Sequence, residues 1–382
     1  MVNRESSNHL RFTIHDSPFT INDSPLTILK RMQQVQIGEK VIGAGSPVFV
    51  IAEIGVNHNG DLALARKLID VAVNAGADAV KFQTFQADQL ATAEAPKADY
   101  QLQSTSAAES QLEMLRKLEL SNDAHRELQA YCRQQGIIFL STPFDEKAAD
   151  FLDELGVAAF KISSGDLTNS PLLQHIALKN KPIILSTGMA DIDEVIEAVS
   201  TVRTLGCESV VLLHCVSNYP ADPKDVNLRA MQTMRSAFDV PVGFSDHTNG
   251  AEVAFAAVAL GACVIEKHFT LDRTLPGPDH KASLEPDELH AMISGIRRVE
   301  SALGNGKKIP TAAEIETAKV ARRSLIAARD INSGSILKRD MIVLKRPGTG
   351  LSPTILETVL GRRLRQNVGA GSLLTLDMFE SD

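Results

Sequence analysis

The sequence predicts an α/β protein built on a (β/α)8 barrel and followed by a small β-rich domain. From residue 48 onward, short runs that are apolar throughout alternate with longer amphipathic runs. Runs of the first kind are typical of parallel strands covered on both faces. Eight such strand–helix units fall within about 255 residues, which matches the number and length of units in this barrel. A doubly wound open sheet is the alternative, but no G-x-G-x-x-G sequence follows the first strand.

Each expected strand is a short run that ends in polar residues. The eight strands are Val48–Gly55, Ala79–Phe85, Ile137–Pro143, Ala159–Gly165, Pro182–Gly188, Val210–Val216, Val242–His247 and Val264–Thr270. The helices between them carry apolar residues at helical spacing, as in the segment 62–72. The helix that begins at Asp191 has acidic residues in its first turn, where the helix dipole favours negative charge.

The chain divides into four segments by its pattern. Residues 1–34 contain a near-repeat with two Ser-Pro breaks and predict a flexible extension, so Met32 is a candidate for the true start. A mass measurement of the natively expressed protein tests that start. Residues 35–304 form the barrel domain and begin with a small hairpin at 35–44. Residues 305–319 are a linker, and residues 320–382 form the second domain.

The second domain contains an internal echo. Residues 331–337 resemble residues 368–374, which predicts a pseudo-twofold arrangement of short strands and Gly turns. The domain is basic, and a solvated or interface-forming face is favoured over a nucleic-acid patch as the reason. Arg346 stands before a Pro-Gly-Thr-Gly loop that presents its guanidinium to an anion or an amide.

The composition narrows the classes of function. The net charge is −8 and no block of Lys and Arg stands out, so no nucleic-acid partner is expected. No apolar run approaches the roughly 18 residues of a membrane span, and the N-terminus lacks a signal-peptide pattern. Four cysteines without a C-x-x-C pair suit a reducing, cytoplasmic location. Trp is absent and aromatic residues are 4%, so stacking platforms are scarce.

The strand ends predict the active site. Active sites of these barrels lie at the C-terminal ends of the strands. Burying polar groups near a core costs free energy, so a group of them there indicates a functional role. Here every expected strand end is polar, and the residues are Glu53, Asn57, Lys81, Gln83, Thr84, Ser141, Thr142, Lys161, Ser163, Ser164, Asp166, Ser186, Thr187, His214, Ser217, Tyr219, Ser245, Asp246, His247, Glu266, Lys267 and His268.

His247 and His268 end two neighbouring strands, and with Asp246, Glu266 and Asp279 nearby they are candidates for a divalent-metal site. On spacing alone, two such histidines are more often structural. His214 and Cys215 are a weaker candidate for a metal or nucleophile role, because Cys215 lies in an apolar run.

The remaining rim residues suggest an anionic substrate. Lys81 and Lys161 with several hydroxyls suit a ligand that carries phosphate and carboxylate. Glu53 can orient or deprotonate a water. Together these groups suit the addition of a phosphorylated enol to an aldehyde, assisted by a metal acting as a Lewis acid. A Schiff-base aldolase using Lys161 or Lys81 is the rival mechanism.

Ordered motifs give the chain a specific resemblance. The segments are 51–60 (IAEIGVNHNG), 81–84 (KFQT), 141–144 (STPF), 161–165 (KISSG), 185–188 (LSTG), 243–247 (GFSDH), 266–269 (EKHF) and 276–279 (PGPD). Over about residues 35–380 the chain resembles the sialic acid synthase family, and 345–348 (KRPG) resembles that family's antifreeze-like (SAF) domain.

The resemblance implies that phosphoenolpyruvate condenses with an N-acylated mannosamine to give a nine-carbon 2-keto sugar acid and phosphate. It implies Glu53, His247 and His268 as catalytic residues, the two histidines holding Mn²⁺, with Mg²⁺ or Co²⁺ as alternatives. It also implies contacts to phosphoenolpyruvate from Lys81, Thr142, Lys161, Ser164, Ser186 and Ser245, and to the sugar from Gln83, Asp166, Tyr219 and Asp279. Arg346 would reach the partner subunit's active site in a domain-swapped homodimer.

Two departures from the family pattern concern the acceptor sugar. Asp166 stands where some relatives carry Glu, and Ser217-Asn218 replaces other polar pairs before Tyr219. The acceptor is expected to be N-acetylmannosamine, giving N-acetylneuraminic acid, or 2,4-diacetamido-2,4,6-trideoxymannose, giving N,N'-diacetyllegionaminic acid. The second acceptor is slightly favoured. Pseudaminic acid synthase is a further alternative.

Overall fold

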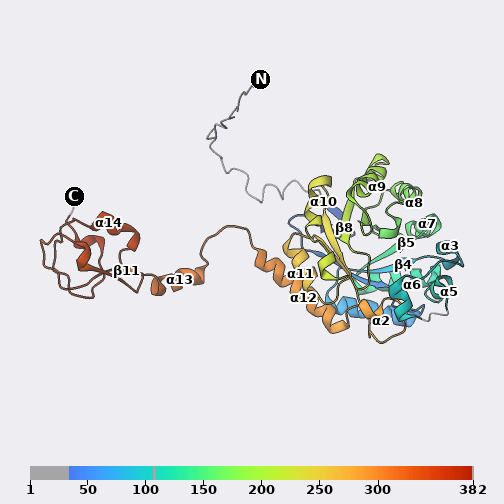
Figure 1. Ribbon diagram of the computed structural model, residues 1–382, viewed down its shortest axis with the longest axis horizontal. Coiled ribbons are helices and arrows are strands. Elements are labelled where there is room, and N and C mark those ends of the chain that lie inside the picture. Colours follow the sequence, from blue (N-terminus) through green and yellow to red (C-terminus); the bar gives the residue numbers. More distant parts are fainter. Residues whose placement is uncertain (1–33, 106–108, 381–382) are drawn as a thin grey trace, which may run out of the picture. The chain divides into compact units, whose positions relative to one another are not determined.

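The computed structural model describes residues 34–105 and 109–380 (Figure 1). It contains two compact units, the first ending at Asn305 and the second beginning at Gly306. The expected N-terminal extension and the start at Met32 lie outside the described residues, apart from Gln34.

The first unit is a barrel of parallel strands. The strands are β3 (Phe49–Gly55), β4 (Ala79–Thr84), β5 (Ile138–Pro143), β6 (Phe160–Ile162), β7 (Ile183–Ser186), β8 (Val210–Cys215), β9 (Val242–Asp246) and β10 (Val264–His268). Their order is β5-β4-β3-β10-β9-β8-β7-β6, and β5 also lies against β6. The (β/α)8 prediction is therefore confirmed, and the open doubly wound sheet is wrong.

A helix follows each strand, and Figure 1 shows these helices around the outside of the barrel. In several of them a side chain satisfies backbone donors of the first turn, as where Asp61 accepts from the N–H groups of Ala63 and Leu64. The helices are α2 (Leu62–Ala75), α6 (Asn122–Gln135), α7 (Glu146–Leu155), α8 (Ser170–Ala177), α9 (Ile192–Thr204), α10 (Ala230–Phe238), α11 (Glu252–Ala259) and α12 (Pro286–Leu303).

An excursion separates β4 from α6. It contains three short helices, α3 (Ala87–Leu90), α4 (Asp99–Ser104) and α5 (Gln111–Arg116). Met114 and Leu118 from this excursion form a buried apolar cluster with Val56 and Phe85. Because Val56 and Phe85 directly follow β3 and β4, the cluster fixes the excursion over the C-terminal ends of these strands.

A hairpin covers the opposite end of the barrel. β1 (Val35–Ile37) and β2 (Lys40–Ile42) pair antiparallel, so the predicted hairpin is confirmed. Val35, Ile37 and Ile42 are buried in one cluster with residues near the starts of the barrel strands, such as Phe49 and Ala79. This packing fills the N-terminal end with apolar side chains and leaves the C-terminal ends for polar groups.

The second unit has a core of its own, formed by residues such as Leu325, Leu337, Leu364 and Leu374. The unit contains α13 (Ala312–Ala321), the antiparallel pair β11 (Ser324–Ala327) and β12 (Ile342–Lys345), and α14 (Leu356–Val359). One-turn 3-10 helices occur in both units, at Ser164–Asp166, Pro223–Asp225, His280–Ala282, Arg339–Met341, Pro353–Ile355 and Leu376–Met378.

The internal echo has a structural counterpart in the second unit. Ile331 and Val368, the first residues of the two similar segments, exchange backbone hydrogen bonds of 2.8 Å in both directions. The two segments therefore pair with each other, which agrees with the pseudo-twofold arrangement expected from the sequence.

Two further expectations concern the environment of the chain. In the described parts of the chain, every helix is too short or too polar to cross a bilayer. All four cysteines are buried and free. No disulfide framework therefore contributes to this fold.

Candidate active site

Strand register brings the first three site residues together. On β3, Glu53 is aligned with Lys81 of β4 on one side and with His268 of β10 on the other. All three side chains are buried. Residues that are far apart in the sequence thus meet at one level of the barrel because its strands are parallel and in register.

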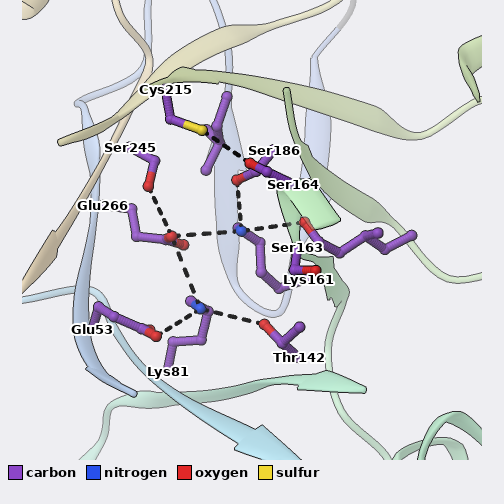
Figure 2. Close-up of polar contacts among 12 residues, drawn as sticks. Glu53, Lys81, Thr142, Lys161, Ser163, Ser164, Ser186, Cys215, Ser245 and Glu266 are labelled. Atoms are coloured by element: carbon purple, nitrogen blue, oxygen red, sulfur yellow. Dashed lines mark hydrogen bonds and ion pairs between the residues drawn. The ribbon is translucent and has the colours of Figure 1, made fainter. Parts of the chain in front are cut away.

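Lys81 lies among carboxylates and a hydroxyl (Figure 2). Its Nζ is 2.8 Å from Oε1 of Glu53 and 3.9 Å from Oε1 of Glu266. It also donates a 3.3 Å hydrogen bond to Oγ1 of Thr142. The ammonium group therefore compensates two buried carboxylates, which would be very costly to bury without a partner.

Lys161 approaches the same carboxylate from the other side of the barrel. Its Nζ donates a 2.7 Å hydrogen bond to Oγ of Ser186 and lies 3.5 Å from Oε1 of Glu266. Ser245 donates a 3.1 Å hydrogen bond to the same oxygen. Figure 2 shows Glu266 between the two lysines. Two ammonium groups and several hydroxyls thus converge, an arrangement that can hold phosphate and carboxylate groups of a substrate.

The pKa values follow from burial and from these ion pairs. Burial raises the pKa of Glu53 to about 7, although the charge of Lys81 opposes the shift. Burial alone would lower the pKa of Lys81, but Glu266 and Glu53 outweigh it and the pKa is raised. Burial would raise the pKa of Glu266, but Lys161 and Lys81 hold it below its ordinary value. Glu53 is therefore the carboxylate suited to exchange a proton near neutral pH.

Ser164 occupies a narrow place beside this network. Its Oγ lies 3.1 Å from Sγ of Cys215 and accepts a 2.9 Å hydrogen bond from the N–H of Gly188. A Cβ on Gly188 would lie 2.2 Å from Oγ of Ser217 and 2.9 Å from Oγ of Ser164. The absence of a side chain at Gly188 is therefore what lets these hydroxyls gather.

The two histidines predicted to hold a metal lie side by side. The ring centroids of His247 and His268 are 5.7 Å apart. The carbonyl of Val216 can only accept a hydrogen bond, so the 2.7 Å contact with Nδ1 of His247 places the proton on that nitrogen. The Nε2 lone pair of His247 is thereby left as the one available to a metal or a donor.

The surroundings keep both rings neutral. Burial lowers the pKa of His247 to about 4, and it lowers the pKa of His268 well below the ordinary value. Nδ1 of His268 is buried and has no hydrogen-bond partner among the described residues. Neutral imidazoles with available nitrogens are the form that binds divalent cations, so this pair fits a metal. Residues 34–105 and 109–380 contain no cluster of three or more His, Cys, Asp or Glu placed to bind one ion.

The expectation that Asp246 contributes to this metal site is wrong. Its carboxylate lies 2.9 Å from Nζ of Lys267, and both side chains are fully buried. It also accepts hydrogen bonds from the backbone and the hydroxyl of Thr248. Side chains alternate between the faces of a strand, so Asp246 and Lys267 lie on the face opposite to Ser245 and Glu266.

Three of the residues predicted to contact the sugar are Tyr219, Asp279 and Gln83. The ring of Tyr219 lies 4.2 Å from that of His247, measured between centroids. Burial raises the pKa of Asp279 to about 6. A Cβ on Gly55 would lie 3.5 Å from Nε2 of Gln83 and 3.3 Å from Cε1 of His268, which puts Gln83 near the histidine pair.

Asp166 lies in a turn of the barrel unit, and Arg346 belongs to the second unit. Asp166 accepts hydrogen bonds from Ser163 at 2.6 Å and Asn169 at 3.2 Å, and so belongs to the turn that follows β6. Arg346 is exposed and directly follows β12 in the second unit.

The sequence missed the place of one site residue and did not select another. Glu266 is expected beside the histidines, but its Oε1 lies between the two lysines, 3.9 Å from Nζ of Lys81 and 3.5 Å from Nζ of Lys161. Tyr100, from the excursion, lies 4.9 Å from Tyr219 between ring centroids. No motif or spacing pointed to Tyr100, because its position depends on how the excursion folds back.

The barrel and its buried charged rim, with the separate β-rich unit, define the class of the protein: a (β/α)8-barrel enzyme with a C-terminal accessory domain. The model of the NeuB family matches residues 68–308, and the model of the SAF domain matches residues 322–380. The chain belongs to the NeuB family, and the predicted resemblance to sialic acid synthases is confirmed.

Named relatives agree with this membership. An N,N'-diacetyllegionaminic acid synthase of Legionella pneumophila is 48% identical over 90% of this chain and 98% of its own. A synthase of the same name from Campylobacter jejuni is 49% identical over 85% and 98%. The structure of a sialic acid synthetase of Leptospira borgpetersenii has a TM-score of 0.67 at 38% identity, covering 75% of this chain and 95% of its own. A pseudaminic acid synthase of Campylobacter jejuni is more distant, at 34% identity over 91% of this chain and 100% of its own. The prediction of a synthase is confirmed.

Proposed function

We propose that this protein condenses phosphoenolpyruvate with 2,4-diacetamido-2,4,6-trideoxymannose and water, giving N,N'-diacetyllegionaminic acid and phosphate. The identity of 48% and 49% to two synthases named for that product supports this acceptor. N-acetylmannosamine, which would give N-acetylneuraminic acid, is the second candidate. Pseudaminic acid synthesis is less favoured, since the relative named for it is 34% identical.

The observation that carries the proposal is the pair of buried lysines on either side of Glu266. Lys81 and Lys161 supply two positive charges within a site lined by the hydroxyls of Thr142, Ser186 and Ser245. Phosphoenolpyruvate carries a phosphate and a carboxylate, which need two such cationic partners. Ser164, on the rim beside Ser186, is a further donor for this substrate in the proposal.

In the proposed reaction the enol carbon of phosphoenolpyruvate bonds to the aldehyde carbon of the open-chain sugar. Water then adds to the carbon that bears the phosphate, and phosphate leaves by cleavage of its C–O bond. Glu53 accepts a proton from that water, because its raised pKa makes it a base effective near neutral pH. Lys81, 2.8 Å away, orients the Glu53 carboxylate.

His247 and His268 would hold a divalent metal, with Mn²⁺ proposed first and Mg²⁺ or Co²⁺ as alternatives. The metal would act as a Lewis acid that polarises the carbonyl oxygen of the aldehyde. The neutral imidazoles and the buried Nδ1 of His268 support this assignment. The proposed contacts to the sugar are Gln83, Tyr219, Asp279 and Asp166. Of these, Asp166 has the least structural support, because its hydrogen bonds lie within the turn that follows β6.

The rival Schiff-base mechanism needs a neutral lysine. The pKa of Lys81 is raised by Glu266 and Glu53, which keeps its amine protonated and unreactive. Burial lowers the pKa of Lys161, so Lys161 is the better candidate for that mechanism. Borohydride trapping of an enzyme–substrate adduct distinguishes the two mechanisms, since only an imine is reduced to a stable covalent product.

Three organisational features complete the proposal. We propose domain boundaries at 35–304, 305–319 and 320–382, which limited proteolysis tests. We propose a cytoplasmic location, supported by the four free cysteines.

We also propose a domain-swapped homodimer in which exposed Arg346 reaches the partner subunit's site. Mixing an Arg346→Ala chain with a Glu53→Gln chain tests the swap, since one restored site per dimer would recover part of the activity.

The deciding experiment measures phosphate release from phosphoenolpyruvate with Mn²⁺ and each of the two sugars, with and without EDTA. Preference for the diacetamido sugar, sensitivity to EDTA and the absence of a borohydride adduct support the proposal. Preference for N-acetylmannosamine would instead assign neuraminic acid synthesis. Turnover that EDTA leaves unchanged, or none with either sugar, would overturn the proposed condensation.

A further inference from the structure

Two tyrosines meet at the edge of the site. The ring centroids of Tyr100 and Tyr219 are 4.9 Å apart, and both side chains are half-buried. The chain has three tyrosines and no tryptophan, so this pair represents most of its large amphipathic aromatic surface. Such rings provide an apolar face together with a polar edge, which suits contact with a sugar derivative.

The pair continues directly into the histidine pair. The Tyr219 ring lies 4.2 Å from the His247 ring and 5.7 Å from the His268 ring. The Tyr219 ring therefore lies between Tyr100 and the histidines that would hold the metal. An acceptor whose aldehyde lies at the histidines must extend its remaining carbons away from them, and Tyr219 and Tyr100 lie along one such direction.

Tyr100 comes from a segment outside the ion-pair network. It lies on α4, within the excursion between β4 and α6. Met114 and Leu118 anchor that excursion to Val56 and Phe85 at the strand ends. Tyr100 therefore comes to the site from a segment that supplies none of the ion-pair network, and its substitution should leave that network intact.

The charge of Asp279 also acts on this pair. Burial raises the pKa of Tyr100 and that of Tyr219, and in both cases the charge of Asp279 adds to the shift. The same carboxylate acts on Lys81. Asp279 is thus close enough for its charge to act on both tyrosines and on Lys81.

A purely structural role is the alternative for Tyr100. A residue that only fills space would be expected among the apolar anchors of the excursion, as Met114 is. Tyr100 instead faces another tyrosine and retains partial exposure at the rim. Its ring is thus partly exposed beside Tyr219.

We propose that Tyr100 is a positioning residue for the acceptor, and that with Tyr219 it forms an aromatic wall against the apolar groups of an acylated amino sugar. This inference rests on the proposed function. The relevant groups are the acetamido methyls and, in the 2,4-diacetamido-6-deoxy sugar, the terminal methyl. The wall therefore favours that sugar over N-acetylmannosamine, which has one acetamido group and a terminal hydroxymethyl.

The test compares Tyr100→Ala and Tyr100→Phe with Tyr131→Phe in the full chain. Tyr131 is a matched control because its hydroxyl bonds to Asp70 at 2.6 Å on the outside of the barrel. Tyr100→Ala should raise the KM for the diacetamido sugar roughly tenfold, and the KM for phosphoenolpyruvate should stay within about twofold. Tyr100→Phe keeps the ring and should stay within about threefold of wild type. Tyr100→Ala should raise the KM for N-acetylmannosamine by a smaller factor.

A measurement of binding that needs no turnover accompanies the kinetics. Phosphoenolpyruvate should protect Tyr100→Ala against thermal unfolding as it protects wild type, which shows an intact ion-pair network. An equal rise in both KM values, a loss of this protection, an equal loss for both sugars, or a Tyr100→Phe variant as poor as Tyr100→Ala would overturn the aromatic wall. If wild type turns over its sugar and Tyr100→Ala matches it, only the wall is wrong. If wild type turns over neither sugar, the proposed function fails and the wall fails with it.

Discussion

Glu53 and Lys81 are aligned on adjacent strands and form a buried ion pair, with Oε1 and Nζ 2.8 Å apart. The pair does not fully offset the cost of burial, because the pKa of Glu53 is still raised to about 7. A carboxylate held near its midpoint at neutral pH can both accept and return a proton.

The pH profile of the reaction should report this pKa. Glu53 accepts a proton only when it is ionised, so kcat/KM should fall as the pH is lowered through about 7 and level off above it. Glu53→Gln should lose about 10²–10⁴-fold in rate. Glu127→Gln, on the surface of α6, is the control and should match wild type. A profile that stays flat in that region, or that Glu53→Gln leaves unchanged, would contradict the assignment of the base.

Metal binding should depend on the two histidines even without turnover. Titration of the metal-free protein with Mn²⁺, followed by electron paramagnetic resonance, should show binding that His247→Ala and His268→Ala each weaken by at least about 10–100-fold. His290→Ala, at an exposed position of α12, should bind as wild type does. Unchanged Mn²⁺ affinity in both site variants would exclude the pair as ligands.

Gly188 should be intolerant of a methyl group. A Cβ there would approach Ser217, Cys215 and Ser164 to 2.9 Å or less. Gly188→Ala should therefore displace the serine hydroxyls and raise the KM for phosphoenolpyruvate by roughly tenfold or more, as expected for a lost hydrogen bond to a charged group. Gly165→Ala is a matched control, since its Cβ would lie in ordinary contact, 3.7 Å from Oγ of Ser163. Equal kinetics for the two variants would show that Gly188 has no such role.

Lys267 should contribute to stability and not to the binding of substrate. It is fully buried, 2.9 Å from Asp246, and also donates to the carbonyl of Thr248. Lys267→Met leaves Asp246 buried without its partner and should lower the free energy of unfolding by about 3–5 kcal/mol. Lys224→Met removes an exposed pair with Asp222 and should change it by at most about 1 kcal/mol. Urea unfolding measures both, and similar values would refute the structural role.

Much of the site could be predicted because barrel strands carry their polar residues at one end. Motifs at the ends of β3, β4, β6, β9 and β10 gave Glu53, Lys81, Lys161, His247 and His268. The structure brings Glu53, Lys81 and Lys161 into one buried network with Glu266 and lays the two histidines side by side. Their roles in the reaction remain predictions.

The prediction was less accurate where it treated each strand end as a single polar group. Asp246 and Lys267 were placed with the rim, but they pair with each other on the opposite face of their strands. The period of two along a strand separates them from Ser245 and Glu266, and that rule could have been applied to the sequence. The same rule places Glu266 on the face of Ser245 and His268, inside the buried network.

The sequence by itself determined the barrel, the small second domain and the family, because strand and helix periodicity and ordered motifs are local properties of the chain. Only the tertiary structure decided which polar side chains meet. Strand register joined Glu53 to Lys81 and His268. The folding of the excursion placed Tyr100 against Tyr219, which is 119 residues further along the chain by their numbers. Such contacts depend on packing between distant segments, and no local pattern encodes them.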